Sequence, residues 1–126
     1  MTAAYVDTSC IVAAAFGEAA ASRVVARLSR FDRVLSSPLL EAELWSALVR
    51  EGREITDAFF AGIEFVVVDR PLSAEIVRVL EAGYLRGADC WHLATALYLA
   101  PDPTELTFVT LDSAQRKIAK TLGFRT

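Results

Sequence analysis

The stretch Ala3-Ala4-Tyr5-Val6-Asp7-Thr8-Ser9 sets the expectation for the rest of the chain. A short apolar run ends here in an acid and two hydroxyls, and an alanine-rich segment with the character of a helix follows at once. An apolar strand that stops at a carboxylate places this charge at the carboxyl edge of a sheet, and open α/β sheets bind their ligands at that edge. Asp7 is therefore the first candidate site residue.

Strands and helices are expected to alternate along the chain. After a strand at residues 4–6, the apolar runs at 34–35, 65–69 and 107–111 have strand character, and Phe124 is a candidate edge strand. Helices are expected at residues 9–16, 18–29, 38–50, 56–62, 73–84, 89–100 and 112–122. This alternation predicts an α/β fold of three layers, α/β/α, with a central, mainly parallel sheet of four to five strands in one domain, residues 1–126.

Three of these helices carry informative patterns. Ser37 and Pro38 form a start signal, with the serine as N-cap and the proline at the first helical position. The helix at residues 89–100 is apolar nearly all round, which is typical of a helix buried in the middle of a domain. The helix at residues 73–84 has one apolar side that is expected to face the core: Ile76, Val77, Leu80 and Tyr84.

Composition narrows the class of protein. Hydrophobic residues make up 54% of the chain and the mean hydropathy is +0.37, yet no apolar run approaches the ~18 residues of a transmembrane helix. The start of the chain lacks the features of a signal peptide, so Cys10 and Cys90 are expected to be reduced, buried thiols in a cytoplasmic protein. Two cysteines and one histidine are too few for a zinc site.

The charge leaves nucleic acid open as a partner. The net charge of −3 argues mildly against it, because domains that bind nucleic acid are usually basic. The objection weakens if four acids surround cations, since the remaining surface then carries +1. Arg23, Arg27 and Arg30 lie on one face of an expected helix. Such a stripe is usually a solvated surface, and contact with phosphate or with an acidic partner is the sharper hypothesis.

Each acid has an ordinary explanation when it is taken alone. Asp7, Asp89 and Asp112 stand at or just before helix starts, where aspartate is a favoured N-cap and suits the helix dipole. Asp112 and Gln115 even resemble a capping box. A single glutamate on the third helix would ordinarily lie on the surface.

Taken together, the acids favour a metal site. Asp7 and Asp112 each close an apolar strand, and Asp89 opens the most apolar helix, so its carboxylate is expected near the core, where it needs a partner. Converging carboxylates would repel one another and raise each other's pKa, and a divalent cation removes this difficulty. A glutamate of the third helix is expected to join them. The helical wheel allows Glu41 and Glu43 equally.

Four motifs run through the chain: Tyr5-Val6-Asp7-Thr8-Ser9, Ser37-Pro38-Leu39-Leu40-Glu41-Ala42-Glu43-Leu44, Asp89-Cys90-Trp91-His92-Leu93-Ala94-Thr95-Ala96 and Phe108-Val109-Thr110-Leu111-Asp112. In order and spacing they resemble those of PIN-domain ribonucleases. The resemblance is strongest to the toxins of bacterial toxin–antitoxin pairs, the virulence-associated protein C group. One departure is the bulky Trp91, because the family usually has small or aliphatic residues after the acid.

The resemblance implies a set of site residues. The family's metal-binding acids correspond to Asp7, Glu43, Asp89 and Asp112. The spacing from Ser37 favours Glu43 over Glu41. The supporting hydroxyls correspond to Thr8 or Ser9, and Thr110. Oxygen ligands without histidine or thiolate suit Mg²⁺ or Mn²⁺.

The implied function is a metal-dependent endoribonuclease toxin that leaves 5′-phosphate and 3′-hydroxyl ends. Its implied partners are RNA, an antitoxin and a second copy of the chain. A mechanism with paired histidines is excluded, because His92 is the only one and is expected to be a packed residue. Trp45 and Trp91 are candidates for stacking on RNA bases. The alternatives are a metal-dependent phosphatase or DNA nuclease, or an α/β interaction module without enzymatic activity.

Overall fold

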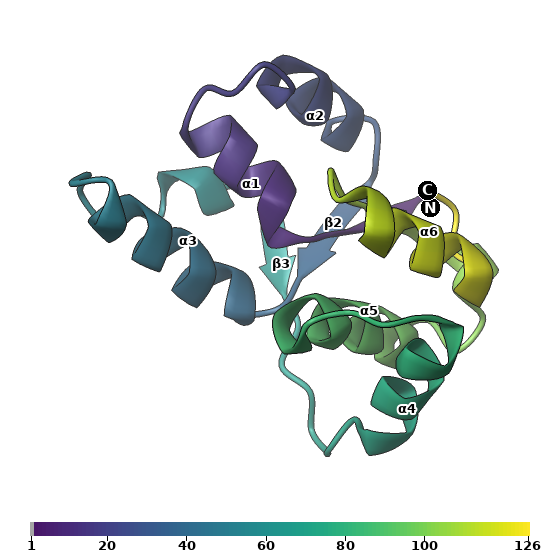
Figure 1. Ribbon diagram of the computed structural model, residues 1–126. Coiled ribbons are helices and arrows are strands. Elements are labelled where there is room, and N and C mark those ends of the chain that lie inside the picture. The colour runs from purple at the N-terminus through teal and green to yellow at the C-terminus, as the bar shows by residue number, and fades with distance from the viewer. Residues whose placement is uncertain (1) are drawn as a thin grey trace.

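The computed structural model describes residues 2–126 and has a four-stranded sheet at its centre (Figure 1). The strands are β1 (Ala3–Val6), β2 (Arg33–Ser36), β3 (Ile63–Phe65) and β4 (Thr107–Val109). They lie in the order β3-β2-β1-β4, and every neighbouring pair is parallel. The chain adds β2 and β3 on one side of β1 and then crosses to place β4 on the other side. The direction in which strands are added therefore reverses between β1 and β4. In α/β sheets, ligands bind beyond the carboxyl ends of the strands at such a switch point.

Within residues 2–126, six α-helices cover the two faces of the sheet. Those of the first half are α1 (Thr8–Ala15), α2 (Ala21–Leu28) and α3 (Leu39–Arg50). Those of the second half are α4 (Ser73–Ala82), α5 (Gly87–Leu99) and α6 (Ser113–Leu122). Two short 3-10 helices, η1 (Ala58–Phe60) and η2 (Pro103–Glu105), lie between elements. The predicted three-layer α/β/α class is confirmed (Figure 1).

Alternation along the strands divides the core into two clusters. In β1, Tyr5 points into one cluster, beneath α4, α5 and α6, where its ring stacks on Phe108 of β4 at 5.5 Å. Ala4 and Val6 point into the other cluster, beneath α1, α2 and α3. All three β1 side chains have no exposed surface. β1 is thus buried on both faces, as expected for a central parallel strand.

The strand predicted at residues 65–69 is misplaced. The third strand is Ile63–Phe65, and it pairs with β2 only as far as the partners Ser36 and Phe65. After Ser36 the neighbouring chain turns into α3, so the valines that follow have no strand to pair with. Val67 is 79% exposed, whereas a buried strand was expected there.

The apolar side predicted for α4 is also wrong in part. Val77, Leu80 and Tyr84 are exposed, and Val79 is the fully buried residue of this helix. Ile76 does pack against the core. The helix thus presents apolar side chains to solvent as well as to α5. No helix within residues 2–126 has both the length and the apolar character needed to cross a membrane.

Candidate active site

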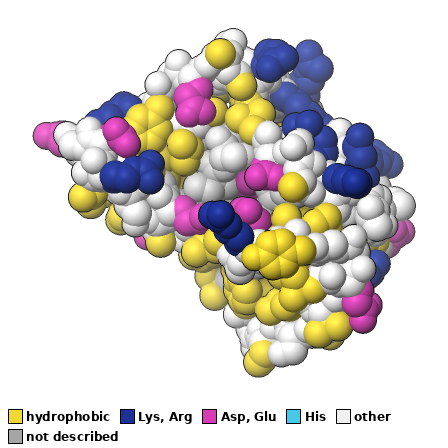
Figure 2. All heavy atoms as spheres, viewed as in Figure 1, with side chains coloured by type: hydrophobic (Ala, Val, Ile, Leu, Met, Phe, Trp, Pro, Cys, Tyr) yellow, Lys and Arg dark blue, Asp and Glu magenta, His cyan; other side chains and the backbone are white. Residues whose placement is uncertain are grey.

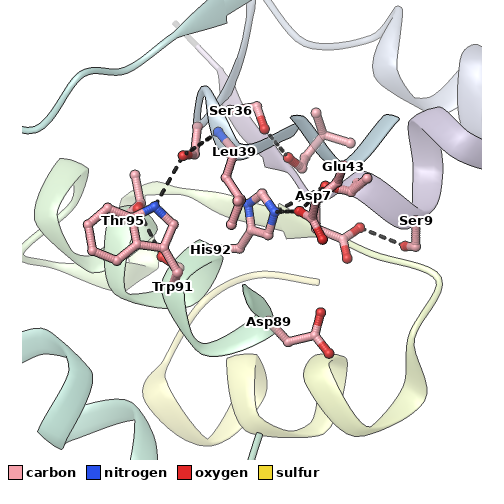
Figure 3. A network of polar contacts seen from close by, with 12 residues as sticks. Asp7, Ser9, Ser36, Leu39, Glu43, Asp89, Trp91, His92 and Thr95 are labelled. Atoms are coloured by element: carbon pink, nitrogen blue, oxygen red, sulfur yellow. Dashed lines mark hydrogen bonds and ion pairs between the residues drawn. The ribbon is translucent and has the colours of Figure 1, made fainter. Parts of the chain in front are cut away.

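Asp7 lies directly beyond the central strand, at the carboxyl edge of the sheet. Its main-chain N–H donates to the carbonyl of Val109 at 3.2 Å, and its residue exposure is 3%. The carboxylate does not cap α1. Instead, Ser9 Oγ donates to Asp7 Oδ1 at 2.6 Å (Figure 3). Burial raises the pKa of Asp7, and the hydrogen bond from Ser9 partly opposes this effect.

Ser9 and Thr110 join the ends of β1 and β4. Ser9 Oγ lies 3.4 Å from Thr110 Oγ1 and accepts from the main-chain N–H of Leu111 at 3.0 Å. Thr110 Oγ1 donates to Gln115 Oε1 at 2.7 Å and accepts from the N–H of Asp112 at 3.0 Å. These hydroxyls bind the two strand ends together beside the acids.

Glu43 projects from α3 toward α1 and α5, while Glu41 is exposed on the outer side of the same helix. Thr8 Oγ1 donates to Glu43 Oε1 at 2.7 Å, and His92 Nε2 lies 3.0 Å from the same oxygen (Figure 3). Burial tends to raise the pKa of Glu43, yet these hydrogen bonds bring it below its ordinary value. The geometry therefore separates the two glutamates that the helical wheel left equivalent.

His92 connects Glu43 to the sheet. It is 1% exposed, and its Nδ1 lies 2.7 Å from the hydroxyl of the fully buried Tyr5. An ionised Glu43 requires a donor at Nε2, so a neutral ring must accept at Nδ1 and the Tyr5 hydroxyl donates to it. His92 is a packed residue, as predicted, and it also orients a candidate site acid.

Asp89 and Asp112 complete the acidic edge. Asp89 lies in the first turn of α5 and accepts no hydrogen bond from residues 2–126 (Figure 3). Burial raises its pKa, and the charges of Asp112 and Glu43 raise it further. Asp112 is the N-cap of α6, where its Oδ1 accepts from the N–H of Gln115 at 2.8 Å. The capping interpretation therefore holds for the side chain of Asp112 and fails for those of Asp7 and Asp89.

At least one carboxylate oxygen of each acid has no hydrogen-bond donor within residues 2–126. The described protein groups donate to Oδ1 of Asp7, Oε1 of Glu43 and Oδ1 of Asp112, and to neither oxygen of Asp89. Within residues 2–126 no fully buried side-chain oxygen or nitrogen lacks a hydrogen-bond partner, so the free oxygens touch solvent. They are available to a cation.

These acids form an open group. In the described part of the chain, no three histidine, cysteine or acidic side chains lie close enough to hold a metal ion together. Burial raises the pKa of Asp89, and the charges of Asp112 and Glu43 raise it further, so these carboxylates lie within electrostatic range of Asp89. The donor chemistry suits a hard cation, and the arrangement suits one that keeps part of its water shell.

Two polar residues of this region were missed as parts of the network. His92 follows Asp89 by three residues, which places both on one helix face, and this spacing is the signal that could have found it. Gln115 has no exposed surface and joins three segments, since its Nε2 also donates to the carbonyl of Asp89 at 3.2 Å. Only the three-dimensional packing identifies the role of Gln115.

Both tryptophans donate hydrogen bonds inside the protein, and both cysteines are buried. Trp45 Nε1 donates to the carbonyl of Thr56 at 2.9 Å, and Trp91 Nε1 donates to Ser37 Oγ at 3.2 Å. The Trp45 ring also stacks on Phe60, with 6.1 Å between the ring centroids. Stacking of either tryptophan on RNA bases stays a prediction. Both cysteines are buried thiols, as expected.

Comparisons with known proteins agree with this architecture. The profile of the PIN domain matches residues 4–121. Ribonuclease VapC46 of Mycobacterium tuberculosis (strain ATCC 25618 / H37Rv) is 33% identical over 126 residues, which cover 98% of this chain and 95% of that protein. No solved structure gives a significant match. The profile match and the identity across nearly the whole chain confirm the resemblance found in the motifs, and the chain therefore belongs to the PIN-domain family.

Proposed function

We propose that this protein is a metal-dependent endoribonuclease and the toxin of a toxin–antitoxin pair. Its similarity to Ribonuclease VapC46 supports the ribonuclease activity and the class of toxin. We assign the catalytic and metal-binding roles to four acids: Asp7, Glu43, Asp89 and Asp112. One observation supports this assignment above the others. At the same edge of the sheet, each of the four acids keeps a carboxylate oxygen that accepts no hydrogen bond from residues 2–126.

Mg²⁺ or Mn²⁺ fits this donor set. Mg²⁺ keeps several waters and usually takes one or two carboxylates together with a substrate phosphate, so an open group of acids is sufficient. A bound divalent cation supplies charge stabilisation to a phosphodiester and lowers the pKa of water nearby. It would also relieve the repulsion that raises the pKa of Asp89.

Neighbouring side chains fix the orientation of two of the acids, Asp7 and Glu43. The Ser9 hydroxyl turns Oδ1 of Asp7 inward, and Thr8 and His92 do the same for Oε1 of Glu43. The opposite oxygens then face the solvent side of the edge, where a phosphate group would lie. Pre-oriented ligands of this kind reduce the reorganisation needed when a substrate binds.

Paired variants test the assignment. Glu43→Gln is expected to reduce Mg²⁺-dependent cleavage of RNA by at least ~100-fold, whereas Glu41→Gln, two residues away on the exposed side of α3, should retain wild-type activity. Asp89→Asn should abolish both cleavage and the heat of Mn²⁺ binding in calorimetry. Full activity in Asp89→Asn, or equal activity in the two glutamine variants, would overturn the assignment. The expected products have 5′-phosphate and 3′-hydroxyl ends.

We further propose that the protein acts in the cytoplasm, with an antitoxin and a second copy of itself as partners. Similarity to Ribonuclease VapC46 supports an antitoxin partner, because the motif resemblance pairs this class of toxin with antitoxins. The exposed apolar side chains of Val77 and Leu80 in α4, and of Tyr84 just after it, support a dimer, because apolar patches of this kind often lie in interfaces. Sedimentation equilibrium of wild type and Tyr84→Lys tests this, since a monomeric wild type would exclude the dimer.

A further inference from the structure

A basic recess lies between α2 and α6, next to the acidic edge. It has a volume of about 330 Å³, and its lining includes Arg23 and Arg27 of α2, Arg116 of α6, and Thr110. Figure 2 shows dark blue side chains gathered over these two helices. Two arginines of the stripe noted in the sequence, Arg23 and Arg27, thus meet Arg116 from a distant segment of the chain, while Arg30 does not line the recess.

The three arginines of this recess form no ion pair with an acid in the described part of the chain. The arginine ion pairs within residues 2–126 join Arg33 to Glu64, Arg50 to Glu51 and Arg70 to Glu75. Moreover, α2 and α6 contain five basic residues and no acidic residue. Like charges collected in one place repel, so this arrangement favours an anion in the recess.

The recess is also connected to the site. Arg116 Nη2 donates to the main-chain carbonyl of Thr110 at 2.8 Å, which holds the guanidinium at the end of β4. Thr110 in turn lies 3.4 Å from Ser9, the residue that donates to Asp7. Burial raises the pKa of Cys10 in α1 to about 12, and Arg27 and Arg116 both act against this effect, so both charges lie near the same buried atom.

We propose that this recess binds the phosphodiester backbone of the RNA strand beside the bond that is cleaved. The inference rests on the proposed ribonuclease function and adds the path of the substrate, from the acids over Thr110 and between α2 and α6. Guanidinium groups bind phosphate oxygens with two parallel hydrogen bonds. In a chain with a net charge of −3, a local basic recess is what allows a polyanion to approach the acidic edge.

Contacts between these arginines and RNA phosphates predict measurable properties of binding and cleavage. Phosphates are the same at every nucleotide, so the arginines should contribute affinity without base preference. Each phosphate contact also releases counterions, and for single strands the slope of log K against log salt changes by about 0.7 per contact. The arginines do not touch the acids, so their loss should raise KM and leave kcat nearly unchanged.

Arg23→Gln and Arg27→Gln test the proposal. Neither side chain makes a described hydrogen bond or ion pair, so both variants are expected to fold. Arg78→Gln is the control for the loss of a surface arginine, because it removes an exposed charge from α4 on the other face of the sheet. Binding of a labelled single-stranded RNA oligonucleotide is measured by anisotropy in the cleavage-deficient Asp89→Asn background, between about 50 and 200 mM salt.

We expect Arg27→Gln to weaken RNA binding about tenfold at low salt and to reduce the salt slope by about 0.7. Arg23→Gln should act in the same direction, and Arg78→Gln should match the Asp89→Asn parent. Equal slopes in all three variants would overturn the proposal. So would unchanged RNA binding together with a lost affinity for a polyglutamate peptide, which would assign the recess to an acidic protein segment instead.

The outcome also separates this inference from the ribonuclease function. If wild type cleaves RNA but the arginine variants bind it like the control, only the substrate path is wrong. If wild type fails to cleave RNA in the presence of Mg²⁺ or Mn²⁺ while the arginine variants lose affinity and salt slope, the recess binds RNA and the enzymatic assignment is wrong.

Discussion

Tyr5→Phe is the sharpest test of the network behind the acidic edge. The change removes one hydroxyl and keeps the ring, which stacks on Phe108 with an interplanar angle of 9°. Without this hydroxyl, Nδ1 of His92 loses its 2.7 Å partner in a site where the histidine is 1% exposed. A change of tautomer at His92 does not restore the hydrogen bond. If Nδ1 carries the proton, this buried N–H lacks an acceptor, and if it does not, the nitrogen lacks a donor.

The expected cost follows from this unpaired nitrogen. A buried polar group left without a partner costs about 1–3 kcal/mol, so Tyr5→Phe should lower the free energy of unfolding by about 2 kcal/mol. For a chain of this length that corresponds to a fall in Tm of about 6–12 °C. Tyr98→Phe is the control, since the Tyr98 hydroxyl donates to Asp69 at 2.8 Å on the exposed surface, where water replaces it at a cost of about 0.5 kcal/mol or less.

Urea denaturation of both variants, and of Tyr5→Phe combined with His92→Leu, provides the measurement. Removing both partners of a buried hydrogen bond costs less than the sum of the single changes, so the double variant should show favourable coupling. Cleavage of RNA by Tyr5→Phe should also fall, because His92 then holds Glu43 less firmly. The reasoning fails if Tyr5→Phe is no less stable than Tyr98→Phe, or if the double variant is strictly additive.

Three further predictions concern charge, packing and thiol chemistry. Burial and neighbouring acids raise the pKa of Asp89 above 3.8, so the folded protein loses stability as the pH rises from about 3.8 through the raised pKa. Asp89→Asn should therefore have a higher Tm than wild type at pH 7. This difference in Tm should vanish below pH ~3.8. Val79→Ala should cost about 2–3 kcal/mol in urea unfolding, while Val77→Ala on the exposed side of α4 should cost under ~0.5 kcal/mol; equal costs would contradict the observed face. Cys10 and Cys90 should resist a thiol reagent at pH 8 until the protein is unfolded, because both are buried and burial raises the pKa of Cys10 to about 12; fast native labelling would refute this.

Features that depend on neighbours in the sequence were predictable. The apolar residues before Asp7, which end abruptly at the acid, predict the buried strand that the structure has. Gly123 ends α6 in the left-handed conformation, at φ +105°, which favours glycine. Asp112 caps its helix as the local pattern indicated. Each of these features is determined by interactions within a few residues of the chain.

Features that depend on distant partners were not predictable from the chain alone. The valines after Phe65 have high strand propensity, but β2 ends at Ser36 and leaves them without a ladder to join. Glu41 and Glu43 are equivalent on a helical wheel, and only the positions of Thr8 and His92 distinguish them. Hydrophobic periodicity indicates which face of a helix or strand is apolar, but it does not indicate which residues of other elements pack against that face.

The hydrogen bonds of the acidic edge divide the four acids into two kinds. Asp7, Glu43 and Asp112 are each held by donors at one oxygen, so their free oxygens have fixed directions. Asp89 has no hydrogen-bond donor within residues 2–126, and burial, together with the like charges of Asp112 and Glu43, disfavours its ionised form. A carboxylate that is unrestrained and electrostatically strained gains most from an incoming cation, because binding relieves the repulsion without breaking a protein hydrogen bond. We therefore expect Asp89 to be the acid whose side chain moves most when a divalent cation binds, while the other three define the place to which it moves.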